Sequence, residues 1–141
     1  MFRHFRFAPL AAALVFAFAT LIPTHVLAQE PGTALVSIYR IAPGKHLDFL
    51  RWQAARDAAS VEAGAGATQW YVHMDGDSWD YVGISPMTTD EQDDKIEQIL
   101  KGKNLTTGFK AGLEFRTMVA SHTDTVASGP STAAALVDAG K

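Results

Sequence analysis

The sequence predicts an α+β fold in which a four-stranded antiparallel sheet carries two helices on one face. Three observations support this prediction. Alternating apolar and polar residues mark strands, apolar residues at three- and four-residue steps mark helices, and the two patterns follow in the order strand, helix, strand, strand, helix, strand. Two helices on one face leave the other face of the sheet uncovered by its own chain.

The first 28 residues have the layout of a secretory signal peptide. Arg3 and Arg6 give a positively charged start, an apolar run extends over residues 7–22, and residues 26–28 are suited to a signal peptidase. We expect cleavage near Ala28 and a periplasmic or secreted product. An uncleaved membrane anchor is less favoured, because the apolar run is shorter than the roughly 20 residues that span a bilayer.

The expected mature chain is acidic and free of cysteine. Removal of 28 of the 141 residues leaves 113, and loss of Arg3 and Arg6 lowers the Lys and Arg count from 12 to 10 against 15 Asp and Glu. The net charge is then about −5, and no basic cluster remains, which argues against nucleic acid and membrane as partners. The lack of cysteine excludes a disulfide scaffold, a thiolate metal site and a cysteine nucleophile. We expect one domain over residues 29–122.

The predicted domain opens with a strand, a helix and a second strand. Residues 33–42 alternate, Pro43-Gly44 interrupts them, and residues 45–63 have helical spacing. Gly64 is a helix C-terminus signal, and residues 68–74 alternate again. The helix face expected to contact the core consists of Leu47, Leu50, Ala54, Ala58 and Val61.

A hairpin and a second helix follow. Asp75–Ser78 is a turn, and residues 79–85 form the third strand before Pro86. Thr88 and Glu91 are spaced as a capping box, and the apolar face of the helix comprises Ile96, Ile99 and Leu100.

The predicted fourth strand covers residues 113–121, where apolar and polar residues alternate. Residues 123–141 form a tail of small residues. This tail is either flexible or forms a short helix over residues 133–137 that docks on the body or on a second subunit.

This element order is the split βαβ pattern of a ferredoxin-like sandwich. Alternation sorts the side chains of its strands into two faces. Beneath the helices we expect Trp70, Val72, Met74, Val82, Ile84, Leu113, Phe115 and Val119. On the uncovered face we expect Ser37, Tyr39, Gln69, Tyr71, His73, Trp79, Tyr81, Gly83, Glu114, Arg116 and Met118.

The stretch YRIAPGK at residues 39–45, followed by Phe49-Leu50, resembles the opening of dimeric α+β barrel proteins. That superfamily includes the stress-responsive barrel proteins, the antibiotic-biosynthesis-monooxygenase-like family and the NIPSNAP-like group. The resemblance covers about residues 33–122 and implies a homodimer in which two sheets face each other. The haem-degrading members use an asparagine, a tryptophan and a histidine; here Asn104 precedes the fourth strand and His46 starts the first helix, so that triad does not transfer.

Aromatic and polar side chains on one sheet face suit a cavity for a small aromatic or apolar ligand. The residues predicted to bind it are Tyr39, Gln69, Tyr71, His73, Trp79, Tyr81 and Arg116. The same residue types favour a dimer interface, so the face has two interpretations. Both hold at once if the cavity lies within a dimeric barrel.

No other motif in the sequence predicts a metal, cofactor or catalytic site. The Asp75-Gly76 turn interrupts the strand, so the side chains of His73, Asp75 and Asp77 are not expected to align as metal ligands. The sequence has no phosphate-binding loop that would indicate a cofactor. His122 and Asp124 are interpreted as a strand exit. The leading hypothesis is therefore an exported, dimeric ligand-binding protein. The alternatives are a cofactor-independent monooxygenase or isomerase using His73 as acid–base residue, and a non-catalytic interaction protein.

Overall fold

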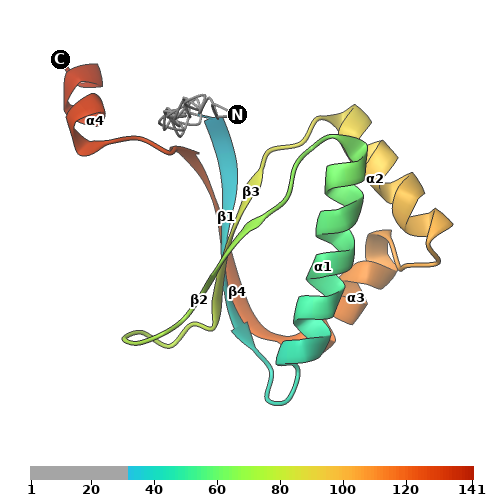
Figure 1. Ribbon diagram of the computed structural model, residues 1–141. Helices are drawn as coiled ribbons and strands as arrows, with labels where there is room; N and C mark the ends of the chain where they lie inside the picture. Colours follow the sequence, from blue (N-terminus) through green and yellow to red (C-terminus); the bar gives the residue numbers. More distant parts are fainter. Residues whose placement is uncertain (1–31) are drawn as a thin grey trace, which may run out of the picture.

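The computed structural model describes residues 32–141, which form a four-stranded antiparallel sheet with a layer of helices on one face (Figure 1). The predicted signal peptide and its cleavage near Ala28 lie outside these residues. In chain order the elements are β1 (Gly32–Ile41), α1 (His46–Ala63), β2 (Gln69–Val72), β3 (Tyr81–Pro86), α2 (Asp90–Gly102), α3 (Gly108–Met118), β4 (Val119–Gly129) and α4 (Ala133–Ala139).

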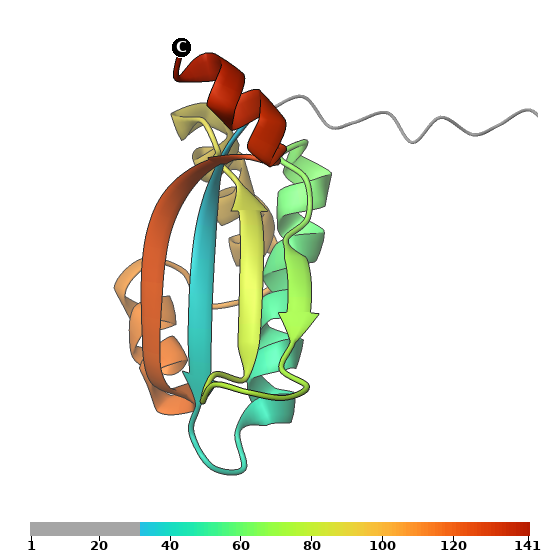
Figure 2. The same ribbon diagram turned by 90° about the vertical axis from the view of Figure 1, so that its left-hand side faces the viewer.

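The strands lie side by side in the order β2-β3-β1-β4, and every neighbouring pair is antiparallel (Figure 2). This is the strand order of the split βαβ arrangement, so the predicted ferredoxin-like α+β fold is confirmed. The longest pairing joins β1 to β4, from Gly32 opposite Gly129 to Ile41 opposite Val119. The outer strands are therefore β2, which is short, and β4.

The core lies between the sheet and helices α1 to α3, and it is mainly aromatic. Phe49 of α1 is completely buried, with its ring 5.7 Å from that of Tyr81 and 5.1 Å from that of Tyr39. Ile41 and Met118 complete the buried cluster. Burial of a side chain such as Phe49 contributes about 1.5–3 kcal/mol.

The predicted fourth strand over residues 113–121 is wrong, because most of this segment is the end of α3. Ala111, Phe115 and Met118 recur at four- and three-residue steps, and these residues turn toward the protein while their neighbours are exposed. Strand β4 starts at Val119 and continues to Gly129. The predicted domain end at residue 122 therefore lies inside β4, and the tail begins only after Gly129.

The predicted core face of α1 is also wrong. The residues that face the core are Phe49, Trp52, Arg56, Ala59 and Ala63, whereas Leu47, Leu50, Ala54, Ala58 and Val61 are exposed. Both sets have helical spacing, and the rings of Phe49 and Trp52 bury more apolar surface than leucine and alanine do. An apolar stripe consequently remains on the outer side of α1.

The helix ends follow the predicted chemistry with one shift in position. Gly64 closes α1 with φ 84°, in the left-handed conformation that glycine adopts readily. The capping box of α2 uses Thr89 and Gln92 in place of the predicted Thr88 and Glu91: the Gln92 N–H donates to Thr89 Oγ1 at 3.2 Å, and the Thr89 N–H donates to Gln92 Oε1 at 3.0 Å.

The C-terminal tail forms the helix α4 that was one of the two predicted alternatives. Thr132 caps it by accepting a hydrogen bond from the Ala135 N–H at 3.1 Å. All its residues are exposed, and Figures 1 and 2 show it beyond the end of the sheet.

Candidate functional site

The two faces of the sheet carry different residues from those predicted on β1 and β3. Tyr39 and Tyr81 lie opposite each other in the register and pack on Phe49, so both are on the helix-covered face. Their predicted place on the uncovered face is wrong. The reason is packing: aromatic rings from both strands surround Phe49 and bury more apolar area than valine or isoleucine would.

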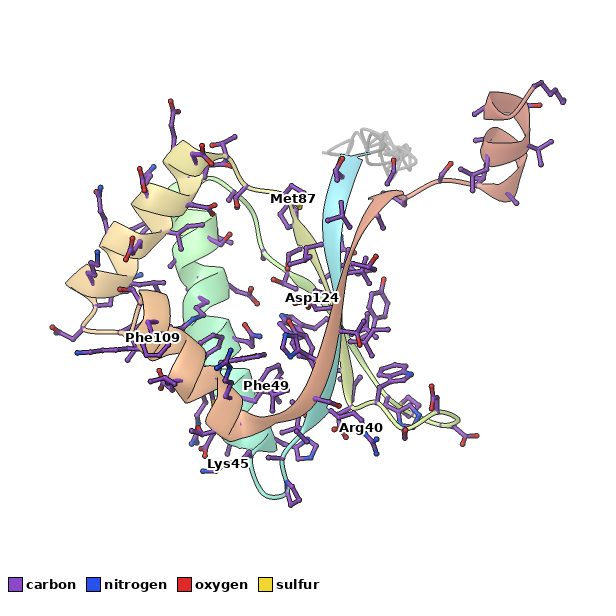
Figure 3. The ribbon with its side chains drawn as sticks, turned by 180° about the vertical axis from the view of Figure 1, so that it is seen from behind. Arg40, Lys45, Phe49, Met87, Phe109 and Asp124 are labelled. Carbon is purple, nitrogen blue, oxygen red and sulfur yellow. The ribbon has the colours of Figure 1, made fainter. Side chains whose placement is uncertain are left out.

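Ser37 and Gly83 share the covered face with these tyrosines and are buried. Conversely, Val82 and Ile84 pair with Ile38 and Val36 on the uncovered face. On β2 the orientation is as predicted: Trp70 contacts Tyr39 and Phe49, which leaves Gln69 and Tyr71 on the uncovered face. Figure 3 shows the division, with Phe49 between helices and sheet and Arg40 on the opposite side.

The structure does not bring the seven predicted ligand-binding residues together. Tyr39 and Tyr81 belong to the core, and Gln69 and Tyr71 lie on the uncovered face. His73 and Trp79 lie in the loop between β2 and β3, where their rings are 4.9 Å apart. Arg116 is an exposed residue of α3, so its predicted place on a fourth strand is wrong.

A cavity of about 610 Å³ lies on the covered side, between the sheet and helices α1, α2 and α3. This volume is in the range of small-molecule sites. The atoms facing the cavity are mainly apolar, with contributions from Leu35, Pro86, Met87, Ile96, Leu100 and Ala111. Its charged lining residues are Arg56, Asp57, Asp93 and Glu97.

Asp57 of α1 joins this helix to the sheet at the cavity wall. One carboxylate oxygen accepts a hydrogen bond from Trp70 Nε1 at 2.8 Å, and the other accepts one from Thr68 Oγ1 at 2.7 Å. The Thr68 hydroxyl also lies 3.0 Å from that of Ser85. Hydrogen bonds to a carboxylate are stronger than neutral ones, so this network fixes the wall of the cavity next to the aromatic core.

Arg56 precedes Asp57 and is held from two sides. Its guanidinium carbon lies 3.2 Å from the centroid of the Trp52 ring, and its Nη2 donates to the Thr106 carbonyl oxygen at 2.9 Å. Burial lowers the pKa of Arg56, while the nearby Glu114 carboxylate opposes this shift. A guanidinium carries five N–H donors, so others remain for a bound molecule.

A histidine–aspartate pair lies on the covered side of β4, outside the residues that line the cavity. His122 Nε2 is 3.4 Å from Asp124 Oδ2, and the His122 ring stacks on Tyr39 with centroids 6.2 Å apart. Burial raises the pKa of Tyr39, and the charge of Asp124 adds to this effect. The prediction treated these residues as a strand exit because it placed the strand about six residues too early.

Sequence reasoning missed Arg56 and Asp57 for a related reason. The predicted core face of α1 turned Arg56 toward solvent and did not include Asp57. The available signal was the spacing of Arg56, which lies four residues after Trp52 and seven after Phe49 and therefore on the same side of the helix as the two aromatic rings, with Asp57 directly after it.

Within residues 32–141, no three metal-ligating side chains gather into a group that could hold an ion. Over the same range, none of the helices has the length and apolar character needed to cross a membrane.

Comparison with known proteins gives structural similarity only. No family model and no curated protein matches the chain. The solved structures that are similar include the Agrobacterium tumefaciens protein Atu4242, with a TM-score of 0.47 and 11% identity over 72% of this chain and 95% of that one. A NIPSNAP family protein of Agrobacterium tumefaciens strain C58 has a TM-score of 0.47 and 12% identity over 72% and 88%.

A third similar structure is a dimeric Bacteroides fragilis protein of unknown function and ferredoxin-like fold, with a TM-score of 0.40 and 11% identity over 72% of this chain and 99% of that one. The NIPSNAP family is one of the groups that residues 39–50 resemble.

Proposed function

We propose that the protein binds a small, mainly apolar molecule with one or two hydrogen-bonding groups in the cavity between the sheet and helices α1 to α3. The observation that carries this proposal is the cavity of about 610 Å³ with Arg56 and Asp57 side by side on its α1 wall. An apolar cavity with a few fixed polar groups is the usual form of a small-molecule site.

The two charged residues have different roles in this proposal. Both oxygens of Asp57 already accept hydrogen bonds from the sheet, so Asp57 holds the wall in place. Arg56 is oriented by Trp52 and Thr106 and has donors to spare, so it directs an oxygen acceptor of the ligand. His73 is not among the cavity residues, and no catalytic role is assigned to it.

We propose a homodimer and export as the context of this binding. The uncovered sheet face carries exposed apolar side chains, among them Ile38 and Tyr71, with 41% and 54% of their surface exposed. A second copy packed on this face would remove them from water. The signal-peptide pattern that ends near Ala28 supports export.

Nile red, an apolar dye whose fluorescence rises in apolar sites, tests the binding proposal. Ser60 of α1 lines the cavity, whereas Ala58 of the same helix is exposed and does not. We expect saturable binding of one dye per chain, lost in Ser60→Trp because the indole fills the cavity. The matched control Ala58→Trp should bind as the parent does. Circular dichroism and thermal melting establish that both variants fold.

Equal binding by the folded Ser60→Trp variant and by the parent would place the dye elsewhere and refute the cavity proposal. Native mass spectrometry of the protein expressed from its full coding sequence adds a second test. A retained small molecule that disappears in Ser60→Trp but persists in Ala58→Trp supports the proposal, and it gives the mass of the natural ligand.

A further inference from the structure

We propose that α4 of one subunit docks on the uncovered sheet face of a second copy of the chain. It would occupy a groove near the start of β1 and the end of β4. The inference rests on the homodimer proposed above and is independent of the ligand cavity. Within the described residues of one chain, nothing packs on the helix α4 and nothing fills the groove. The proposal makes each of these two features the partner of the other.

Within residues 32–141, no other part of the chain buries the helix α4. It spans seven residues, all exposed, with 64% of the surface of Leu136 and 62% of that of Val137 open to solvent. An isolated helix shorter than about 12 residues is marginal in water even for favourable sequences. The Thr132 cap alone does not compensate for this, so α4 needs a surface on which its apolar side chains pack.

The groove has a volume of about 520 Å³ and lies on the uncovered face. The register places Ala34, Val36, Ile84 and Ala127 on this face, and Gln69 and Tyr71 beside them. Its lining contains no charged side chain and has many small residues, which let a helix approach closely. The apolar segment of α4 is equally uncharged, because Asp138 lies past Val137 and pairs with Lys141 at 2.8 Å.

The direction of the tail favours a second copy as the partner. Gly129 and Pro130 border the groove, and from there the chain carries α4 away from its own sheet. Both views place α4 beyond the sheet end and to the side away from helices α1 to α3, which is where a second copy on the uncovered face would lie (Figures 1 and 2). In a twofold-symmetric pair each α4 would reach the partner's groove, so the contact would form twice.

Disulfide trapping tests the proposal cleanly because the chain has no cysteine of its own. Full-length chains carrying Leu136→Cys and Gln69→Cys, each with a different tag, are co-expressed and oxidised mildly. We expect a covalent heterodimer at a yield at least about 10-fold above that of the matched pair Leu136→Cys with Ala58→Cys, since a disulfide needs Cα atoms within about 7 Å. Ala58 belongs to the exposed stripe of α1, the alternative surface for α4.

Preferential trapping at Ala58→Cys would overturn the proposal, as would the absence of any trapped heterodimer. So would a disulfide formed only within one chain when Leu136→Cys and Gln69→Cys are combined, because α4 would then cover its own groove.

Analytical ultracentrifugation distinguishes a failure of the docking proposal from a failure of the homodimer proposal on which it rests. The double variant Leu136→Asp and Val137→Asp should raise the dimer dissociation constant by about 10-fold or more, since each apolar side chain is buried twice. Phe109→Asp with Leu113→Asp, exposed residues of α3, is the matched control and should leave it unchanged. A parent protein that stays monomeric refutes the homodimer; a dimer whose constant the α4 variants do not change refutes only the docking. Nile red binding remains a separate readout of the cavity.

Discussion

The hydrogen bond between Asp57 and Trp70 is expected to stabilise the fold measurably, and a double-mutant cycle isolates its contribution. The perturbations are Asp57→Asn, which keeps the shape and removes the charge, and Trp70→Phe, which removes the N–H donor. The bond is 2.8 Å long, and both side chains are half-buried between α1 and the sheet.

The magnitude follows from the type of bond. A hydrogen bond to a charged group contributes about 1.5–3 kcal/mol to stability. Asp57→Asn also weakens the bond from Thr68, so this single variant should lose about 2–4 kcal/mol. In the Trp70→Phe background, Asp57→Asn can weaken only the hydrogen bond from Thr68. The expected coupling energy between Asp57 and Trp70 is therefore about 1–2 kcal/mol.

Urea unfolding followed by far-UV circular dichroism gives the four free energies of unfolding, and it does not depend on tryptophan fluorescence. Trp52→Phe is the matched control, because Trp52 Nε1 is buried and has no hydrogen-bond partner within residues 32–141. Its coupling to Asp57→Asn should be close to zero. A Trp70 coupling below about 0.5 kcal/mol, equal to that of the control, would refute the view that Asp57 fastens α1 to the sheet.

Three further predictions use other parts of the molecule. Thr89→Ala should lower the free energy of unfolding by about 1 kcal/mol, because Thr89 is the N-cap of α2. Thr88→Ala should change it by less than half as much, and urea unfolding of both variants measures the difference. Burial raises the pKa of Tyr39 above 10.0, so the unfolded state ionises first and stability should fall as the pH rises above 10. Tyr39→Phe should lessen this decline and the exposed Tyr71→Phe should not, as pH-dependent urea unfolding will show. Intact-mass measurement of the product of full-length expression in a bacterium should give a chain that starts after Ala28, and an uncleaved chain would contradict the signal peptide.

The fold was predictable because its local signals agree with one another. Alternation in β1, the glycine that ends α1 and the hairpin at Asp75-Gly76 each define an element, and their order then selects the split βαβ arrangement. The signal failed at residues 113–121. A period of two groups Phe115 with Leu113 and Val119, whereas a period of 3.6 groups it with Ala111 and Met118. Over a segment this short the two periods cannot be distinguished, and only contact with Phe49 and Trp52 decides for the helix.

The candidate site was less predictable, because it depends on which face of each element is buried. A strand or helix pattern defines two sides without saying which one meets the core. On β1 both sides carry large side chains, Ile38 on one and Tyr39 on the other, and the choice follows from aromatic packing around Phe49. The core face predicted for α1 was wrong in the same way, and Arg56 and Asp57 therefore could not be recognised as cavity residues.

The three tryptophans lie in three separate environments. Trp70 donates a hydrogen bond to Asp57 beside the cavity, Trp52 lies under Arg56 in the helix layer, and Trp79 contacts His73 in the loop between β2 and β3. Each indole is consequently an intrinsic optical reporter of a different region. Chains that retain one tryptophan at a time would allow emission spectra and quenching by acrylamide to follow the cavity, the helix layer and the loop separately, without an added label.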